Sequence, residues 1–136
     1  WEAVRYLRQT YFFDRVPIED PYTWTFEHKE HVHFVLYKGP KIIGYAHIQL
    51  WADKRAAMRI IVIDEAYRDQ GYGSQFLKLC ELWLAHQKIS KLLVQSSPDA
   101  YQFYRRNNYI EMPFNDPDGY EGDPRDIEVG KQLTSW

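Results

Sequence analysis

A change of hydrophobic period across a glycine-containing turn constrains this chain more than any other feature of its sequence. Residues 56–63, AAMRIIVI, form an apolar run that is typical of a buried strand. From Ser74 onward the apolar residues recur at helical spacing, in the stripe Phe76, Leu77, Cys80, Trp83 and Leu84. Residues 67–74, YRDQGYGS, separate the two runs and carry glycines at positions 71 and 73. The sequence therefore predicts a strand, a tight turn and a helix in immediate succession.

The other elements follow from the same patterns and predict a mixed fold. Residues 2–13 have helical periodicity, and the proline-containing stretch after them is predicted as a loop. The alternating runs 31–37 and 41–51 flank Gly39-Pro40 and predict a hairpin, which residues 56–63 extend into an antiparallel meander. The remaining predicted elements are a strand at 91–96, a helix at 97–108 and two strands at 109–114 and 126–133. We therefore expect an α/β (α+β) fold with a mixed, mostly antiparallel central sheet flanked by helices.

Composition and charge narrow the class of protein and of partner. The 136 residues, of which 45% are hydrophobic, suffice for a single domain over residues 1–136. With 17 basic and 19 acidic residues, the chain lacks the positive field that attracts nucleic acid. No apolar run reaches the roughly 18 residues of a membrane span, so we expect a soluble, cytoplasmic protein without membrane attachment. Because the sequence opens on Trp1 rather than Met, we expect it to be a piece of a longer chain.

The two glycines admit several interpretations. A dinucleotide-binding fingerprint requires a third glycine where this chain has Phe76, and a P-loop requires a lysine that does not follow Gly73. A tight turn without a ligand remains open, because any strand that passes directly into a helix needs such a turn. An anion site also remains open: glycines let a phosphate approach the backbone closely, and the N–H groups at a helix start stabilise negative charge.

Two motifs at the right separation resemble those of one family. Arg68-x-x-Gly71-x-Gly73, directly after an apolar strand, resembles the coenzyme A motif of the GNAT superfamily of N-acetyltransferases. SPDAYQFYRRNNY, residues 97–109, resembles the later segment of that family, which it matches at Ala100, Phe103, Tyr104 and Tyr109. Ser97 stands where asparagine is usual, and Asn108 stands where glycine is usual. The resemblance covers roughly the whole chain, with the first strand of the family expected before Trp1.

The resemblance implies a reaction and a cofactor. Acetyl-CoA would be the co-substrate, without a metal ion, and a primary amine would attack the thioester directly with both substrates bound. Tyr104 would protonate the departing thiolate as general acid, which suits a phenol with an ordinary pKa of about 10; packing on the sheet is the alternative role. The strand backbone would pair with the pantetheine arm, and the turn would hold the phosphates. The cofactor-binding residues implied are Ile61, Ile63, Arg68, Asp69, Gln70, Gly71, Tyr72, Gly73, Ser74 and Ser97.

The general base stays open at this stage. Some family members carry a glutamate on the third strand, where this chain has Ala57. His47, Glu111, His33 or a chain of water molecules could instead accept the proton of the amine. His47 alternates with apolar neighbours along its strand, a pattern more typical of a solvated strand face than of a base.

Two further clusters suggest ligands. His31 and His33 share a strand face close to His28, but no carboxylate or thiolate completes a metal-binding spacing, so we expect no metal site. The segment 115–128 carries six acidic residues against Arg125 alone. In the family this region borders the acceptor site, so an acidic lip would favour a cationic amine. A solvated loop is the alternative.

Two classes of function therefore remain. The first is an N-acetyltransferase acting on a small-molecule or peptide amine. The second is a non-catalytic module that binds an acyl-CoA or regulates a larger protein, which the missing strand glutamate at Ala57 keeps open. A second copy of the chain is a candidate partner, because an aromatic content of 17% can leave rings at an interface.

Overall fold

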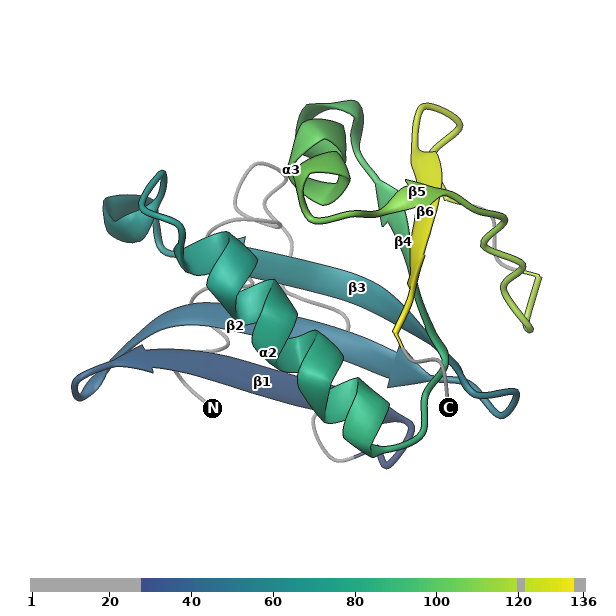
Figure 1. Ribbon diagram of the computed structural model, residues 1–136, viewed down its shortest axis with the longest axis horizontal. Coiled ribbons are helices and arrows are strands. Elements are labelled where there is room, and N and C mark those ends of the chain that lie inside the picture. The colour runs from purple at the N-terminus through teal and green to yellow at the C-terminus, as the bar shows by residue number, and fades with distance from the viewer. Residues whose placement is uncertain (1–27, 120–121, 134–136) are drawn as a thin grey trace, which may run out of the picture.

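A six-stranded sheet forms the centre of the molecule in the computed structural model, which describes residues 28–119 and 122–133 (Figure 1). Its strands are β1 (His31–Lys38), β2 (Lys41–Leu50), β3 (Arg55–Ile63), β4 (Lys91–Ser96), β5 (Ile110–Glu111) and β6 (Ile127–Gln132). They lie in the order β1-β2-β3-β4-β6-β5, and all neighbours are antiparallel except β3 and β4. The predicted mixed, mostly antiparallel sheet is confirmed. The predicted helix at 2–13 and the loop after it lie outside the described residues.

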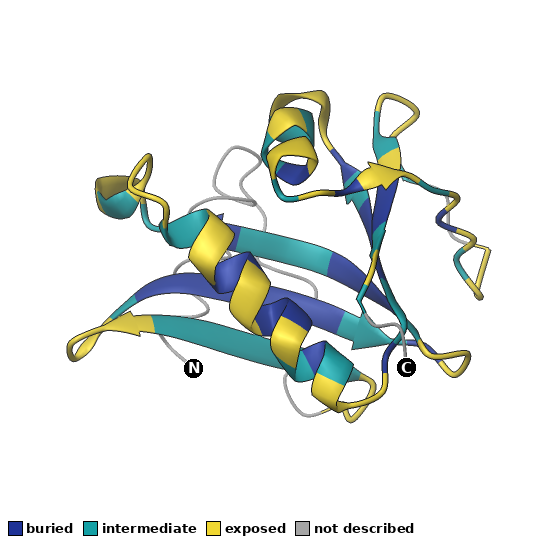
Figure 2. Cartoon of the chain, in the orientation of Figure 1, coloured by how far each residue is buried: buried dark blue, intermediate teal, exposed yellow. Residues whose placement is uncertain are grey.

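One long helix, α2 (Tyr72–His86), crosses a face of this sheet (Figure 1). Its apolar stripe turns toward the strands, and the buried residues gather between helix and sheet (Figure 2). Cys80 belongs to this core at 1% exposure, and burial raises the pKa of its thiol to about 12. No helix within the described residues is long and apolar enough to cross a membrane.

The predicted helix at 97–108 is divided into two parts. The Ser97 side chain accepts a hydrogen bond from the Ala100 amide and caps a 3₁₀ turn at Pro98–Ala100. The second part is α3 (Tyr101–Arg106), and Asn108 beyond it adopts the left-handed conformation with φ +70°. The start and the end of this helical segment therefore lie where local sequence signals predict them.

Two of the boundaries that differ from the predictions have a clear local cause. The helix α2 begins at Tyr72 instead of Ser74, because Gly71 takes the left-handed conformation from which the helix can start at once. The strand predicted at 109–114 ends at Glu111, and the last bond to β6 is that of the Met112 amide. Pro113 follows, and proline has no N–H to continue the ladder.

A buried polar triad joins α2 to the end of the sheet. The Tyr109 hydroxyl donates to Glu81 Oε2 over 2.7 Å, and Lys131 Nζ donates to Glu81 Oε1 over 2.9 Å. Glu81 is only 9% exposed, and burying a carboxylate is unfavourable unless it is paired, so these two partners stabilise it in place. Burial, followed by the Glu81 carboxylate, raises the pKa of Tyr109 well above its ordinary value, which keeps the hydroxyl protonated as a donor.

We expect Glu81→Ala to lower the free energy of unfolding by about 2–4 kcal/mol, because it leaves a buried hydroxyl and an ammonium without their acceptor. Tyr109→Phe removes only one donor and should cost about 1 kcal/mol. Urea unfolding followed by circular dichroism measures both. Equal losses in the two variants would contradict a central role for the carboxylate.

Candidate active site

The strands β3 and β4 diverge at one end of the sheet (Figure 1), and we call the region between their diverging ends the opening. The two strands pair in parallel from Arg55 and Lys91 as far as Met58 and Val94, and no further. β3 then continues to Ile63 while β4 turns away. The two strands therefore splay apart beyond Met58 and Val94.

A β-bulge in β3 accounts for the opening. Met58 lies opposite Ile48 of β2 and Ile60 lies opposite His47, so Arg59 has no partner residue on β2. An extra residue bends its strand and interrupts the ladder. The bulge lies where the β3–β4 pairing stops, so the bend in β3 directs the rest of the strand away from β4.

The far end of β3 directs backbone groups into the opening. The Asp64 amide donates to the Ile43 carbonyl on β2 over 2.7 Å. Because successive residues of a strand alternate in direction, the N–H and C=O groups of Ile63 and Ile61 point away from β2, toward the opening. Arg68 Nε donates to the Ile63 carbonyl over 3.0 Å, so the Arg68 side chain lies back against the strand end.

The turn after β3, residues 64–71, presents an unpaired helix start beside the opening. Asp69 and Gly71 adopt left-handed conformations, with φ +60° and +86°. The first amide groups of α2, those of Tyr72, Gly73 and Ser74, donate to no acceptor among the described residues. Such groups together with the helix dipole stabilise an anion. We call the turn and these three residues the cradle.

The second glycine of the cradle is required by packing. A Cβ at Gly73 would lie 3.2 Å from Phe103 Cε1 of α3, a contact tighter than ordinary van der Waals distance. At Gly71 a Cβ would meet nothing within 4 Å, so that position needs glycine for its φ alone. The two glycines therefore serve different purposes: Gly71 forms the turn, and Gly73 brings α2 and α3 together.

Several predicted cofactor side chains are already engaged within the chain. Gln70 Nε2 donates to the Ala66 carbonyl over 3.3 Å, and the Ser97 hydroxyl is the helix cap described above. The Tyr72 ring lies 5.2 Å from the Lys38 ammonium. These contacts shape the cradle, and the groups left open to a ligand are mainly backbone amides.

Tyr104 lies on α3 beside the same opening and is 5% exposed. Its ring packs edge-on against Tyr109, at 5.4 Å between centroids, and against Phe103 at 5.2 Å. Burial raises the pKa of its hydroxyl well above the ordinary value, and no hydrogen bond to the hydroxyl is present in the described part of the chain. The phenol is therefore protonated at neutral pH and has a proton to donate.

An acidic hollow of about 980 Å³ lies between the ends of β4, β5 and β6. Gln95, on the part of β4 that β3 no longer pairs with, is one of its lining residues. Among the described residues, the charged ones that line the hollow are all acidic: Glu111, Asp116, Asp123, Asp126 and Glu128. Arg125 neutralises Asp123 in an ion pair of 2.8 Å at the surface.

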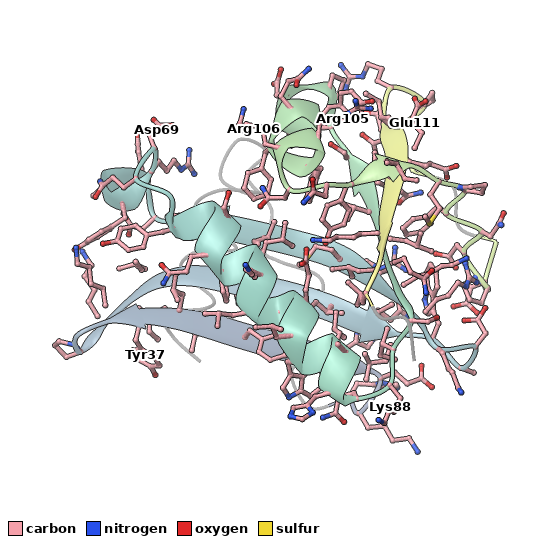
Figure 3. The ribbon with its side chains drawn as sticks, viewed as in Figure 1. Tyr37, Asp69, Lys88, Arg105, Arg106 and Glu111 are labelled. Carbon is pink, nitrogen blue, oxygen red and sulfur yellow. The ribbon has the colours of Figure 1, made fainter. Side chains whose placement is uncertain are left out.

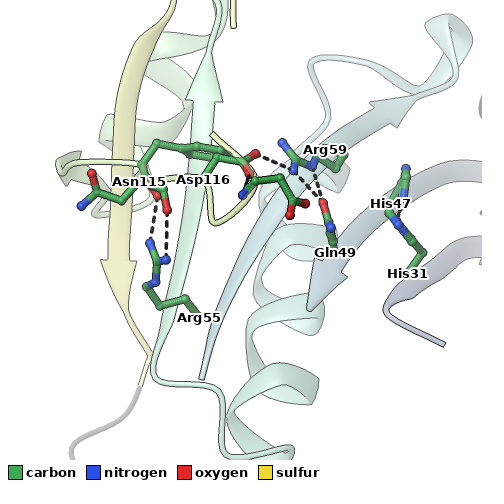
Figure 4. A network of polar contacts seen from close by, with 9 residues as sticks. His31, His47, Gln49, Arg55, Arg59, Asn115 and Asp116 are labelled. Carbon is green, nitrogen blue, oxygen red and sulfur yellow. Dashed lines mark hydrogen bonds and ion pairs between the residues drawn. The ribbon is translucent and has the colours of Figure 1, made fainter. Parts of the chain in front are cut away.

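Arg59 ties the bulge to the hollow and was missed by the sequence analysis (Figure 4). Its guanidinium donates to Gln49 Oε1 over 2.6 Å and to Asp116 Oδ2 over 3.1 Å. The Asp116 side chain is 2% exposed, so this pair is well shielded from solvent. Arg55 donates to the neighbouring carbonyls of Phe114 and Asn115 and holds the same segment. The available signal was a lone arginine within the otherwise apolar run AAMRIIVI.

Three histidines of β1 and β2, His31, His33 and His47, gather on the sheet face away from α2. His31 Nδ1 and His47 Nε2 are 2.8 Å apart (Figure 4). The His33 ring stacks on that of His47 at 4.5 Å between centroids. His47 is 4% exposed, so the expectation of a solvated strand face is wrong for this residue. Within the described residues no group of three or more side chains is arranged to hold a metal ion.

The residues considered as general base do not meet in one place. Glu111 is exposed on β5 and lines the acidic hollow, on the side of α3 away from Asp69 of the cradle (Figure 3). His47 is buried on β2 against His31. Ala57, at the position of the family glutamate, is fully buried in an apolar cluster with Leu93 and offers no base.

The sequence of the chain matches the acetyltransferase (GNAT) family over residues 1–109. The chain therefore belongs to this family, as its two motifs predicted. Membership supports acyltransferase activity with an acyl-CoA as donor. No curated protein sequence matches the chain significantly.

Solved structures share the fold. An aminoglycoside 6′-N-acetyltransferase complexed with coenzyme A superposes with a TM-score of 0.78 at 12% identity, covering 99% of this chain and 91% of its own. Escherichia coli ElaA superposes with a TM-score of 0.76 at 19% identity, covering 96% of this chain and 88% of its own. The ribosomal-protein-S18-alanine N-acetyltransferase from Escherichia coli superposes with a TM-score of 0.63 at 19% identity, covering 79% of this chain and 72% of its own. At these identities the likeness shows the fold alone.

The histidine pair predicts a pH-dependent stability. Burial, followed by the charges of His28, His33 and Arg59, lowers the pKa of His31 from 6.5 to about 4. Because the unfolded chain takes up the proton first, the His31 contribution to stability is present above pH 6.5 and is lost as the pH falls toward 4. Native protein should therefore lose more stability over this interval than His31→Gln. Urea unfolding midpoints of both proteins at several pH values test this. Midpoints that fall equally with pH in native protein and in His31→Gln would contradict it.

Proposed function

We propose that this protein transfers an acetyl group from acetyl-CoA to a primary amine by direct attack in a ternary complex. The observation that carries the proposal is the combination of an unpaired β3 edge with the cradle at the same opening. A strand edge can pair with the amide groups of a pantetheine arm, and a helix start can bind the pyrophosphate. Family membership agrees with this donor.

The residues of the opening fit such a donor. Ile61 and Ile63 supply strand N–H and C=O groups, although the Ile63 carbonyl already accepts from Arg68. The cradle supplies the first amide groups of α2, and Gly71 leaves open space where a side chain would stand. When bound, acetyl-CoA supplies an activated thioester carbonyl, and the chain orients it and stabilises its phosphates.

Tyr104 is proposed as the general acid. As the amine forms its bond to the acetyl carbon, the carbon–sulfur bond breaks and the thiolate requires a proton. The buried phenol of Tyr104 keeps its proton at neutral pH and stands on the helix beside the opening. Burial raises the pKa of this phenol and so makes it a weaker acid, but the same burial destabilises the departing thiolate, so the proton transfer depends on both groups sharing one desolvated site.

Glu111 is proposed as the base, in preference to His47. The attacking amine must be neutral, and a lysine-like ammonium has an ordinary pKa of about 10.4. Glu111 is exposed and lines the hollow, whose lining also includes Asp116, the ion-pair partner of Arg59 at the bulge. His47 is 4% exposed and could act only through His31 or water. The proton would pass from the amine to the carboxylate and then to solvent.

For Tyr104→Phe we expect kcat to fall by about 10²-fold, because the proton donor is lost while the ring packing is kept. Calorimetry should give unchanged affinity for acetyl-CoA, and thiol release measured against an amine panel gives kcat. Native protein that binds acetyl-CoA but acetylates no amine would instead support a non-catalytic acyl-CoA-binding or regulatory module. Full activity in the variant would refute the assigned role.

The acceptor is proposed to be cationic. Glu111, Asp126 and Glu128 line the hollow without an ion-pair partner among the described residues. The attacking amine itself needs only one such carboxylate, so a further positive charge on the same molecule would find a partner. Among the proteins that share the fold are enzymes described as acting on an aminoglycoside and on a ribosomal protein.

We expect a linear diamine to show a KM about threefold to tenfold below that of a matched monoamine, through attraction to the acidic lining. Asp126→Asn combined with Glu128→Gln should raise KM for the diamine and leave KM for the monoamine nearly unchanged. Steady-state kinetics with both amines, at low and high salt, provides the comparison. A KM that rises equally for both amines would exclude charge recognition.

A further inference from the structure

A side-chain clasp joins the two helices that flank the cofactor opening. Asn107, at the end of α3, donates from Nδ2 to the hydroxyl of Ser74 in the first turn of α2 over 3.1 Å. The same nitrogen donates to the Phe103 carbonyl over 2.8 Å. The two helix ends are 33 residues apart in the sequence, yet this amide holds them together at the cradle.

The second bond fixes the direction of the first. A carbonyl oxygen can only accept, so the atom of Asn107 beside the Phe103 carbonyl must be its amide nitrogen. That nitrogen can only donate, and Ser74 Oγ therefore acts as acceptor toward Asn107. The hydroxyl proton of Ser74 must then point elsewhere. Ser74 is exposed at the start of α2, where the neighbouring amide groups also lack acceptors.

We propose that Asn107 is a positioning residue that makes Ser74 a hydrogen-bond donor to a phosphate of the acyl-CoA. This inference rests on the proposed function, because it takes the cradle as the pyrophosphate site. Asn107 holds the Ser74 oxygen from the side of α3 and leaves its proton free to join the amide donors of α2. A hydrogen bond to a charged phosphate is stronger than one to a neutral group, so the orientation of one hydroxyl affects affinity.

The isosteric variant Asn107→Asp reverses the polarity of the clasp. A carboxylate accepts only, so it would take the Ser74 proton away from the phosphate and could not donate to the Phe103 carbonyl. Asn108→Asp is the matched control, because it adds the same charge one residue away, at a left-handed position that aspartate tolerates. Among the described residues, the side-chain hydrogen bond to Ser74 comes from Asn107 and not from Asn108.

We expect Asn107→Asp to weaken coenzyme A binding at least about tenfold more than Asn108→Asp does, by calorimetry. The KM for acetyl-CoA should rise with kcat nearly unchanged. In a Ser74→Ala background the two aspartate variants should have equal affinities. With S-acetylpantetheine, which carries no phosphate, Asn107→Asp and native protein should have equal kcat/KM.

The outcomes separate this inference from the function on which it rests. Equal losses in the two aspartate variants, or an Asn107→Asp defect that persists with S-acetylpantetheine, would overturn the positioning role and leave the acetyltransferase standing. Native protein that does not bind coenzyme A would overturn the proposed function itself. Urea unfolding of Asn107→Asp shows whether the variant is folded, and the Ser74→Ala cycle tests the coupling in folded protein.

Discussion

The end of the β3–β4 pairing at Met58 and Val94 is the constraint on which the rest of the site depends. Parallel strands that remained paired would fill each other's hydrogen bonds and leave no edge for a ligand. The bulge at Arg59 ends that pairing, and the Arg59 guanidinium donates hydrogen bonds to the side chains of Gln49 and Asp116. One extra residue therefore creates the opening and anchors the segment that borders the hollow beside it.

The opening lies between two regions of opposite electrostatic character. On the side of α2, the unpaired amide groups of Tyr72, Gly73 and Ser74 favour an anion. On the side of β5 and β6, the hollow is lined by acidic residues and favours a cation. A reaction between a phosphate-bearing donor and an amine fits such a division, because each substrate would be attracted to its own side.

Local signals explain which parts of the fold could be predicted. The strand at 56–63, the capping role of Ser97 and the left-handed Asn108 each depend on residues close in sequence. The strand predicted at 109–114 was too long, because the alternation of apolar residues continues past the proline whose missing N–H ends the hydrogen-bond ladder. His47 was expected on a solvated face because strand alternation cannot tell which sheet faces become covered.

The sequence by itself determined the family, the strand, turn and helix of the cradle, and the helix that carries Tyr104, because short-range periodicity and turn chemistry specify such elements. Only the tertiary structure decided which polar groups meet. Arg59 and Asp116 are 57 residues apart, and the Tyr109 hydroxyl reaches Glu81 across 28. Whether a buried charge is neutralised or a hydroxyl donates depends on neighbours that chain folding brings within about 3 Å, the range of a hydrogen bond.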